Sequence, residues 1–518
     1  MNFTRRHFVG LTGSALALAT GGCDGPDGGL VSVRRWLGKP AAPVFEKPRI
    51  LPESKEIDPI AHALNRMTFG ARANDYARVS EQGVEQFLEE QLNPASIEDW
   101  QCDRLIRHEF EEFSEPESRL FPHPGKSDAM AELFPALKNG SGSRVGDLYE
   151  WKERPLLENL TRSSILRAVM SRRQLYEVMV QFWTDHFNID PSKGECKWLK
   201  AADDRDVIRQ HALGSFPEMV RASAVSPAML WYLDGRVNRS GKPEERPNEN
   251  YARELMELHT LGVHGGYTQK DVMEVARCLT GWTVRDQKQF FKGQVHFDAK
   301  AHDDGAKTVL GQVIPAGLGI RDLDRLLEIV TGHPSTARFI ATKLCRRFIA
   351  DAPPASAIDA TAAAFTQSKG AIAPTLRALF KTPEFGASAG LKLKRPFHYV
   401  VSALRLTNAE TNGGRPIIDA LVRMGHAPFR YPTPDGYPEE ASHWTGTLLW
   451  RWNFAVNLVN NKMAGTRIRT DLTEAMGGDE ALMATSLGRQ PTERERESYK
   501  ASGAGLAMLL ASPAFQRC

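Results

Sequence analysis

The sequence predicts a mainly α-helical protein, built as one large multi-helix domain with a small β insert around residues 285–312. Three observations support this prediction. Apolar residues recur at helical spacing along most of the chain, helix-start and helix-stop residues bracket these runs, and alternating strand patterns are few. The chain has 518 residues, of which 42% are hydrophobic and 25% charged, which is typical of a protein that buries a core.

The first 23 residues have the pattern of an export signal and are excluded from the fold. The adjacent pair Arg5 and Arg6 is followed two residues later by Phe8 and then by a short apolar stretch from Leu11 to Ala19. This order fits the twin-arginine pattern. The pattern predicts a protein of the periplasm or cell envelope.

Cys23 ends this segment and follows small residues, as at a bacterial lipoprotein cleavage site. Lipidation there would hold the protein on a membrane surface, and we expect no other membrane contact. The alternative is cleavage near Ala19, which would leave a free periplasmic protein. Residues 24–55 are rich in glycine, proline and charge and are expected to form a flexible tether to a helical domain over 56–515.

Charge and cysteine content exclude other classes. A net charge of +3 without a basic run gives no support for nucleic-acid binding. Beyond the N-terminus, no stretch approaches the ~18 apolar residues that span a bilayer. The six cysteines form no CxxC pair, and Cys278 and Cys345 lie in helical apolar patterns typical of buried thiols. A disulfide framework is not expected, although a single bridge stays open.

The helices begin just after the tether. Asp58 followed by Pro59 predicts a capped helix that stops at Gly70. The next helical run is bounded by Asn74 and Asn93. Further helical patterns cover residues 155–190, two or three segments over 204–236, and a helix that begins at a Thr268 cap.

A small hairpin is expected between Trp282 and Leu310, through "QKQFFKGQVHFDAK" and "KTVLGQVI". Helical patterns then continue through "HPSTARFIATKLCRRFIA" and "AIDATAAAFTQSKGAIAPTLRALFKTPEF". The chain has no internal repeat of fixed period.

The best candidate site lies in "NENYARELMELHTLGVHGGYTQKDV", residues 248–272. On a helix, Asn250, Glu254 and Glu257 fall within about 60° of one another, opposite an apolar stripe. Their oxygens are suitable ligands for a hard or borderline cation. The alternative is a solvated face with an Arg253–Glu257 ion pair.

Three histidines are further candidates. His186 follows Phe182 by one turn, so its ring lies on the apolar side and needs a partner, which could be a distant carboxylate, a metal or a backbone carbonyl. His302 opens a polar turn in "AHDDGAKTVLG". His333 precedes a helix for which Ser335 is the expected cap.

Three cations share one helical face: Lys343, Arg346 and Arg347. They could bind an anion or form ion pairs with the glutamates, and a solvated helix side is the alternative. The signatures GxSxG, HExxH, GxGxxG and the Walker loop are absent from the sequence, which removes support for serine hydrolase, zincin and nucleotide-binding classes.

Several motifs occur together and in a fixed order from about residue 58 to 515: "HALNRMTFG", "FWTDHFN", "SPAMLWYLDG", "NENYARELMELHTLGV", "YTQKDVMEVARCLTGW", "HDDGAKTVLG", "HPSTARFIATKLCRRF", "LKRPFHYVVSALR" and "PTPDGYP…HW…RWNFA". In this order they resemble the bacterial DUF1800 family. The tail departs from the family pattern at Tyr437, where Gly-Trp-Pro is expected, so a local aromatic contact is in doubt. The resemblance implies an exported, largely helical protein of unestablished function, and a partner from the exported DUF1501 family. It implies no catalytic residues.

Two functions follow as hypotheses. The first is a metal-assisted or acid–base enzyme of the envelope, hydrolase-like, with one Glu/His cleft and a divalent metal as its cofactor. Its catalytic residues would be Glu254, Glu257 and His302, and its metal ligands His186, Asn250, Glu254 and His333. The second is a non-catalytic helical scaffold that binds another exported protein. A haem or redox protein is a third reading, based on His186 beside Trp183, but the sequence has no CxxCH.

Overall fold

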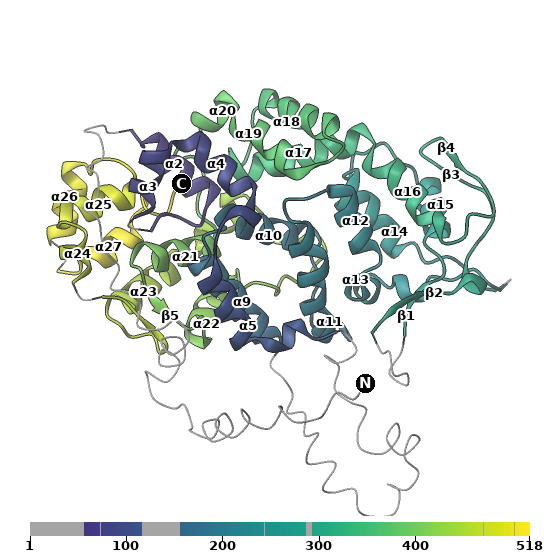
Figure 1. Cartoon of the computed structure of the whole chain (residues 1–518), viewed down its shortest axis with the longest axis horizontal. Coiled ribbons are helices and arrows are strands. Elements are labelled where there is room, and N and C mark those ends of the chain that lie inside the picture. The colour runs from purple at the N-terminus through teal and green to yellow at the C-terminus, as the bar shows by residue number, and fades with distance from the viewer. Residues whose placement is uncertain are drawn as a thin grey trace, which may run out of the picture.

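The computed structural model describes residues 56–72, 74–116, 156–242, 244–285, 293–469, 471–501 and 503–518 (Figure 1). The predicted export signal with Arg5 and Arg6, the predicted lipidation site Cys23 and the tether lie outside these residues. The described chain is mainly α-helical with short antiparallel strand pairs, which confirms the predicted fold class.

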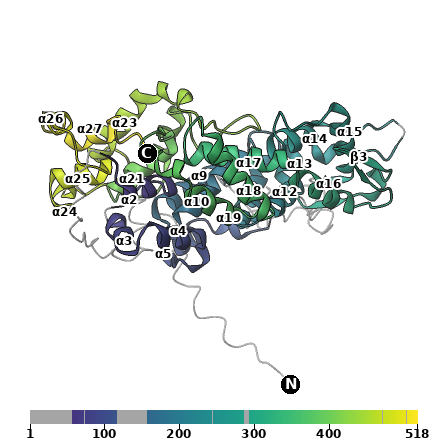
Figure 2. The same cartoon turned by 90° about the horizontal axis from the view of Figure 1, so that it is seen from above.

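The molecule is longer than it is deep, and its chain crosses it more than once (Figures 1 and 2). The C-terminal helices α23–α27 form one end, where the first helix α2 also lies. Helices α12–α16 and the first four strands form the other end. Helices α9, α10 and α17–α19 lie between the two ends.

The N-terminal helices follow their capping residues. Helix α2 (Pro59–Met67) begins as predicted, because the Asp58 side chain accepts a hydrogen bond of 2.8 Å from the Ile60 amide. The run predicted from Asn74 to Asn93 is divided at Gly83, whose φ is +84°, into α3 (Asp75–Gln82) and α4 (Val84–Leu92).

The next helices build the middle of the molecule and lead to the candidate site. They are α5 (Trp100–Glu109), α9 (Leu156–Met170), α10 (Gln174–His186), α11 (Cys196–Asp203), α12 (Phe216–Ala224), α13 (Pro227–Tyr232), α14 (Asn250–Glu254) and α15 (Gln269–Cys278). Helix α11 continues into a π-helix, η4 (Asp204–Arg209), and α14 continues into another, η6 (Leu255–Thr260). Short π segments are rare in proteins, and those that occur are often found at functional sites. The predicted Thr268 cap of α15 is confirmed as a capping box with Asp271.

The predicted β insert is present as two hairpins. β1 (Trp282–Val284) pairs with β2 (Val295–Phe297), and β3 (Lys307–Val309) pairs with β4 (Gln312–Ile314), both antiparallel. A third pair, β5 (Glu410–Thr411) with β6 (Thr466–Arg467), was not predicted.

The remaining helices are α16 (Arg321–Thr331), α17 (Pro334–Phe348), α18 (Ala355–Gln367), α19 (Ile372–Phe380), α20 (Pro383–Gly386), α21 (Pro396–Leu406), α22 (Arg415–Arg423), α23 (Leu448–Val459), α24 (Leu472–Ala475), α25 (Asp479–Leu487), α26 (Glu493–Ala501) and α27 (Gly505–Ala511). Short 3₁₀ turns also occur: η1 (Pro94–Ser96), η2 (Glu111–Ser114), η5 (Gly235–Val237), η7 (Ala299–Ala301), η8 (Ala441–His443) and η9 (Thr445–Thr447). The expected Ser335 cap of α17 is wrong. His333 is the N-cap, and its Nδ1 accepts from the Ser335 amide at 3.2 Å.

One large hydrophobic core joins most of the described helices, and every residue of α21 is buried in it. A smaller cluster lies at the C-terminal end, formed by Leu472, Met476, Leu482, Met483, Leu487 and Leu509. The five cysteines in the described part of the chain are buried and unpaired, as expected for Cys278 and Cys345. Over the same residues, no helix combines the length and the apolar character that a membrane span requires.

Candidate functional site

The candidate site forms where residues 431–437 pass over the C-terminal end of α10; we call these residues the 431–437 loop. Gly436 has a φ of +73°, and a Cβ there would lie 1.9 Å from the backbone oxygen of Asp185. Asn188 donates from Nδ2 to two carbonyl oxygens of the loop, at 2.9 and 2.7 Å. The Tyr232 hydroxyl donates to a third at 2.9 Å. Glycine at 436 therefore permits the close approach, and Asn188 and Tyr232 fix it.

His186 at the end of α10 is buried among aromatic rings and contacts Lys343 of α17. Its Nε2 is 3.1 Å from the backbone oxygen of His259, which can only accept a hydrogen bond, so Nε2 carries the hydrogen and Nδ1 is free to accept. The Lys343 Nζ lies 3.0 Å from Nδ1 and donates to it. Burial, then the charge of Lys343 and His259, holds the pKa of His186 well below its usual value, so the ring is neutral.

Lys343 is half-buried and has an unusual environment for a lysine. Burial lowers the pKa of its amine to about 8, although Asp185, Glu439 and Asp435 act to raise it. Within the residues that the structure describes, no carboxylate oxygen lies within 4.0 Å of Nζ. The amine is therefore held by a neutral imidazole and not by a salt bridge.

Glu254 and Glu257 are half-buried at the junction of α14 and the π-helix η6. Burial and then the neighbouring Glu257 raise the pKa of Glu254, and Asp435 adds to this effect. Arg253 forms its ion pair with Glu249 at 2.9 Å and not with Glu257. Glu257 is instead 3.5 Å from the Tyr267 hydroxyl.

Asp435 of the 431–437 loop links the two halves of the site. Its charge acts on Glu254 on one side and on Lys343 on the other. We define the loop site as Asp185, His186, Glu254, Lys343 and Asp435. It combines an acid of raised pKa with an amine of lowered pKa, which is an arrangement typical of proton transfer near neutral pH.

A buried cluster of ion pairs contacts the loop site through Asp185. Arg395 donates from Nη1 to Asp185 at 2.8 Å and also approaches Glu439 at 3.4 Å. Burial raises the pKa of Asp185 to about 6, against Arg395. Burial also acts to raise the pKa of Glu439, but Arg395, Arg347 and Lys392 together lower it to about 2.

The three cations predicted to share one face have different partners. Arg347 approaches Glu439 at 3.6 Å and Arg346 approaches Glu440 at 3.4 Å, whereas Lys343 contacts His186. The two arginines thus form ion pairs with acids that follow the 431–437 loop, and not with Glu254 or Glu257.

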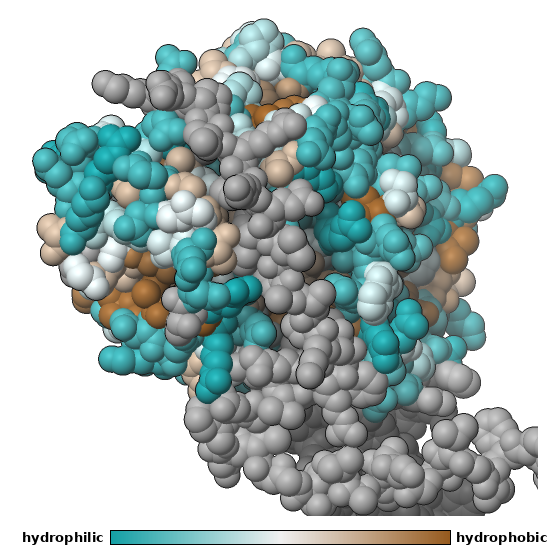
Figure 3. Space-filling view, turned by 60° about the vertical axis from the view of Figure 1, so that its left-hand side comes forward, coloured by the Kyte–Doolittle hydropathy of each residue, from teal (hydrophilic) through white to brown (hydrophobic). Residues whose placement is uncertain are grey.

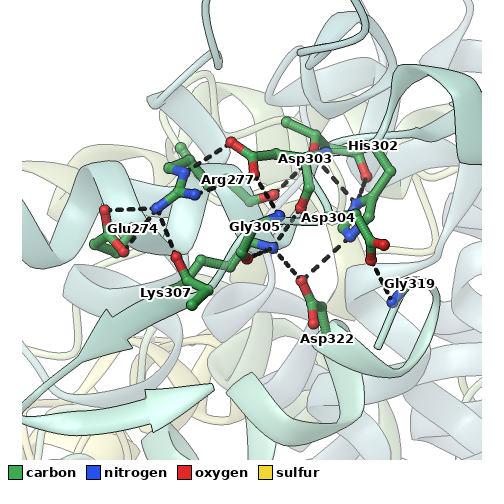
Figure 4. A network of polar contacts seen from close by, with 12 residues as sticks. Glu274, Arg277, His302, Asp303, Asp304, Gly305, Lys307, Gly319 and Asp322 are labelled. Carbon is green, nitrogen blue, oxygen red and sulfur yellow. Dashed lines mark hydrogen bonds and ion pairs between the residues drawn. The ribbon is translucent and has the colours of Figure 1, made fainter. Parts of the chain in front are cut away.

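His302 lies in a separate network, shown in Figure 4, at the end of the molecule that α12–α16 and the first four strands form. Its Nδ1 is 2.9 Å from the Thr280 carbonyl oxygen and its Nε2 is 3.2 Å from the Asp322 carboxylate. Lys307 donates to the same carboxylate. Nearby, Arg277 pairs with Asp303 at 2.7 Å and with Glu274 at 3.0 Å. These residues, the His302 network, join the β3–β4 hairpin to α15 and α16.

His333 lines a third location, a cleft of about 610 Å³ between α12, α16, α17 and α18. An ion pair of 2.8 Å between Arg221 and Asp324 lies in the wall of this cleft. Asn250 is also engaged elsewhere, because its Nδ2 donates to the Leu233 carbonyl at 3.1 Å. The structure therefore brings His186 and Lys343 together, and places His302 and His333 with other partners.

No group of three or more His, Cys, Asp or Glu side chains arranged to hold an ion occurs among the described residues. The predicted ligands His186, Asn250, Glu254 and His333 do not gather at one point, and their role in metal binding stays a prediction. Sequence reasoning missed Asp185, Arg395, Asp435 and Glu439. The signal that could have found them is their position in the sequence. Three of them lie in the motifs "FWTDHFN", "LKRPFHY" and "PTPDGYP", and Glu439 directly follows the last motif.

The fold and the loop site define a class: a large helical protein in which an imidazole and an amine from distant helices meet beside a loop that packs on the end of α10. The chain belongs to the DUF1800 family, described as a protein of unknown function, which matches residues 62–517. The resemblance drawn from the ordered motifs is thereby confirmed. No curated protein and no solved structure matches the chain.

Proposed function

We propose that the protein is an exported cell-envelope enzyme that works by acid–base chemistry at the loop site. The contact of 3.0 Å between Lys343 Nζ and His186 Nδ1 carries the proposal. An amine whose pKa is about 8 exists in both protonation states near neutral pH, so it can accept and return a proton. Envelope polymers are the proposed substrates, because the export signal directs the protein to that compartment.

Three residues of the loop site have distinct proposed roles. Lys343 removes a proton from the attacking water, and Glu254, whose pKa is raised, supplies a proton to the leaving group. His186 is a positioning residue, because its neutral ring orients the amine without competing for the proton. Asn188 and Tyr232 hold the loop that carries Asp435.

A metal-assisted version of this function depends on Glu254 and Glu257 as ligands. Both ring nitrogens of His186 have partners within the protein, and Nδ1 of His333 caps its own helix. Two carboxylates with bound water are a suitable site for a hard divalent ion, which would lower the pKa of that water. Metal analysis of protein purified without chelator, with and without Glu254→Gln and Glu257→Gln, separates this version from the metal-free one.

The experiment incubates the purified protein with isolated envelope polymers and measures released products by mass spectrometry. We expect Lys343→Met and Glu254→Gln to lower the release rate by about 100-fold or more, which is the usual contribution of a general acid or base. Because Glu254 must keep its proton while Lys343 has lost its own, the rate of the wild-type protein should pass through an optimum and fall as the pH rises above about 8.

Lys394→Met is the matched control, because burial also lowers the pKa of Lys394 to about 8 but its amine donates to Ser402 and lies over the Phe515 ring. This variant should keep the activity. Wild-type protein that releases nothing, or variants at 343 and 254 that are as active as wild type, would leave the non-catalytic scaffold as the better account.

A further inference from the structure

An exposed apolar face lies where α22 meets the start of α23. It consists of Val422, Leu448, Leu449, Trp450 and Trp452, whose exposed fractions lie between 37% and 64%. We call these five residues the α22–α23 face. They are five of the eleven large hydrophobic residues that are exposed in the described chain, and four of them are within five consecutive positions. Exposed apolar residues that are clustered in this way mark an interaction site.

The core does not require these side chains. Helix α23 already buries Arg451, Phe454, Ala455 and Leu458 on its inner side. A helix that is also apolar on its outer side has a second partner to contact. Figure 3 brings this end of the molecule forward and shows hydrophobic surface, in brown, beside hydrophilic surface.

The chain around α23 is free of acidic residues, and Asp419, the acid of α22, is paired with Arg415 at 3.0 Å. Residues 441–469 contain no aspartate or glutamate, while Lys462 and Arg467 are exposed there. The Arg423 guanidinium lies 5.3 Å from the centre of the Trp450 ring, at the edge of the face. Tryptophan and leucine beside arginine are the residues that proteins place at the headgroup level of a bilayer, and the cations complement anionic lipids.

The N-terminal tether enters the described chain at the same end of the molecule. The Asp58 amide donates to the Gly488 carbonyl oxygen at 2.8 Å, which joins the start of α2 to the end of α25. Helices α2, α23 and α25 lie together at this end in both views (Figures 1 and 2). The 32 residues from 24 to 55 could reach up to roughly 110 Å when extended. A lipid on Cys23 would therefore tether the molecule to the membrane by this end.

We propose that the α22–α23 face rests on an anionic phospholipid surface, with its leucine and tryptophan side chains at the headgroup level. This inference goes beyond the proposed acid–base function, because it concerns where the molecule stands and not what it catalyses. The face would hold the molecule weakly by itself, and a lipid on Cys23 would add the second signal that stable anchoring requires.

The test measures hydrogen–deuterium exchange of the full chain carrying Cys23→Ser, with and without vesicles of phosphatidylethanolamine and phosphatidylglycerol at 3:1. We expect vesicles to slow exchange in peptides from residues 415–423 and 448–459. The double substitution Leu449→Ser with Trp452→Ser should remove this protection and weaken vesicle partitioning by about tenfold. The export signal is the same in every protein and does not affect the comparison.

Trp100→Ser is the matched control, since Trp100 is 52% exposed on α5 and lies outside the face. It should bind vesicles as the wild type does, and phosphatidylcholine vesicles should bind all proteins less well. Protection that appears without vesicles and grows with protein concentration would identify a second copy of the chain as the partner and overturn the proposal. Equal vesicle binding and equal local protection in the wild type and the double variant would also overturn it.

Discussion

Gly436 has a backbone conformation and a neighbour that no other residue type could accommodate without a shift. Its φ is +73°, and a Cβ added to its Cα would lie 1.9 Å from the backbone oxygen of Asp185 at the end of α10. A side chain there would separate the 431–437 loop from α10, because backbone atoms cannot turn away as a flexible side chain can.

We expect Gly436→Ala to destabilise the protein by about 3 kcal/mol or more beyond the cost of its backbone conformation. Gly425→Ala is the control. Its φ is +74°, but nothing lies within 4 Å of the added Cβ, so it should cost only about 1–2 kcal/mol. Thermal denaturation of both variants measures the difference. Equal melting temperatures for the two variants would show that the close approach to Asp185 is not a constraint.

Sequence reasoning reached His186 but not its partners. The helical spacing from Phe182 predicted a buried ring that needs a hydrogen-bond partner, and the ring is buried. Its partners are a carbonyl oxygen at residue 259 and the amine of Lys343, 157 positions away in the chain. Periodicity gives the face of a helix but not the helix that packs against it, so Lys343 was recognised as a cation and not as a partner of His186.

At the scale of elements, the His302 network fastens the β3–β4 hairpin to α16. The ring of His302 lies between Thr280, whose carbonyl oxygen is 2.9 Å from Nδ1, and Asp322, whose carboxylate is 3.2 Å from Nε2. Asp322 thereby contacts two buried side chains, the Lys307 amine and the His302 ring. Its carboxylate is the group on which the attachment of the hairpin depends (Figure 4).

We predict that Asp322→Asn lowers the free energy of unfolding by about 3 kcal/mol at neutral pH, because it leaves buried positive charge without its partner. Burial acts to raise the pKa of Asp322, but the bonds from His302 and Lys307 outweigh it and lower the pKa. The carboxylate therefore stabilises the fold above its ordinary pKa, and this contribution is lost as the pH falls through the lowered value. The difference in the free energy of unfolding between wild type and variant should therefore become smaller in acid.

Asp324→Asn on the same helix is the control for that measurement. Asp324 pairs with Arg221 across exposed surface, and such pairs contribute about 0–1 kcal/mol. Denaturant unfolding at pH 7 and at pH 3 compares the two substitutions. A loss for Asp322→Asn as small as that for Asp324→Asn would contradict the assigned role of the network.

Local chemistry predicted helix starts better than it predicted interruptions and short strands. Asp58 and Thr268 were recognised as caps because their side chains bond to nearby amides, and both do so. The break at Gly83 and the two-residue strands β5 and β6 were missed. A strand of two residues has no alternating pattern to detect, because it depends on a partner 55 positions away along the chain.

At the scale of the whole molecule, the C-terminal end is held differently from the rest. Its small cluster of six buried side chains, from Leu472 to Leu509, is separate from the large core that includes α10 and α21. Elements with little buried apolar area open locally at a lower free energy than the global unfolding.

We therefore expect the amides of α24–α26 to exchange with solvent at a lower free energy than those of α21. Leu482→Ala should cost about 2–5 kcal/mol in the small cluster and speed exchange in α24–α26 while leaving α21 unchanged. Val400→Ala, in the middle of α21, should instead speed exchange throughout the molecule. If Leu482→Ala speeds exchange in α21 to the same extent, the two clusters unfold as one unit and the prediction fails.

The class of fold and the family could be predicted from the sequence, whereas the positions of the acids and histidines relative to one another could not. The helical periods from Ile165 to Phe187 and the ordered motifs needed no long-range information. The expected meeting of Glu254 with His302 and His333 required knowledge of how helices cross. The structure instead gives these histidines partners in α16 and α17.

The position of the 431–437 loop also determines when a growing chain can complete the site. A ribosome makes α10 and the π-helix η6 long before it reaches Gly436. The end of α10 therefore lacks its contacts with the 431–437 loop during most of synthesis. Similarly, α2 waits for Gly488 near the end of the chain. The contacts of the 431–437 loop with α10 are therefore missing from every nascent or truncated form that stops short of the loop.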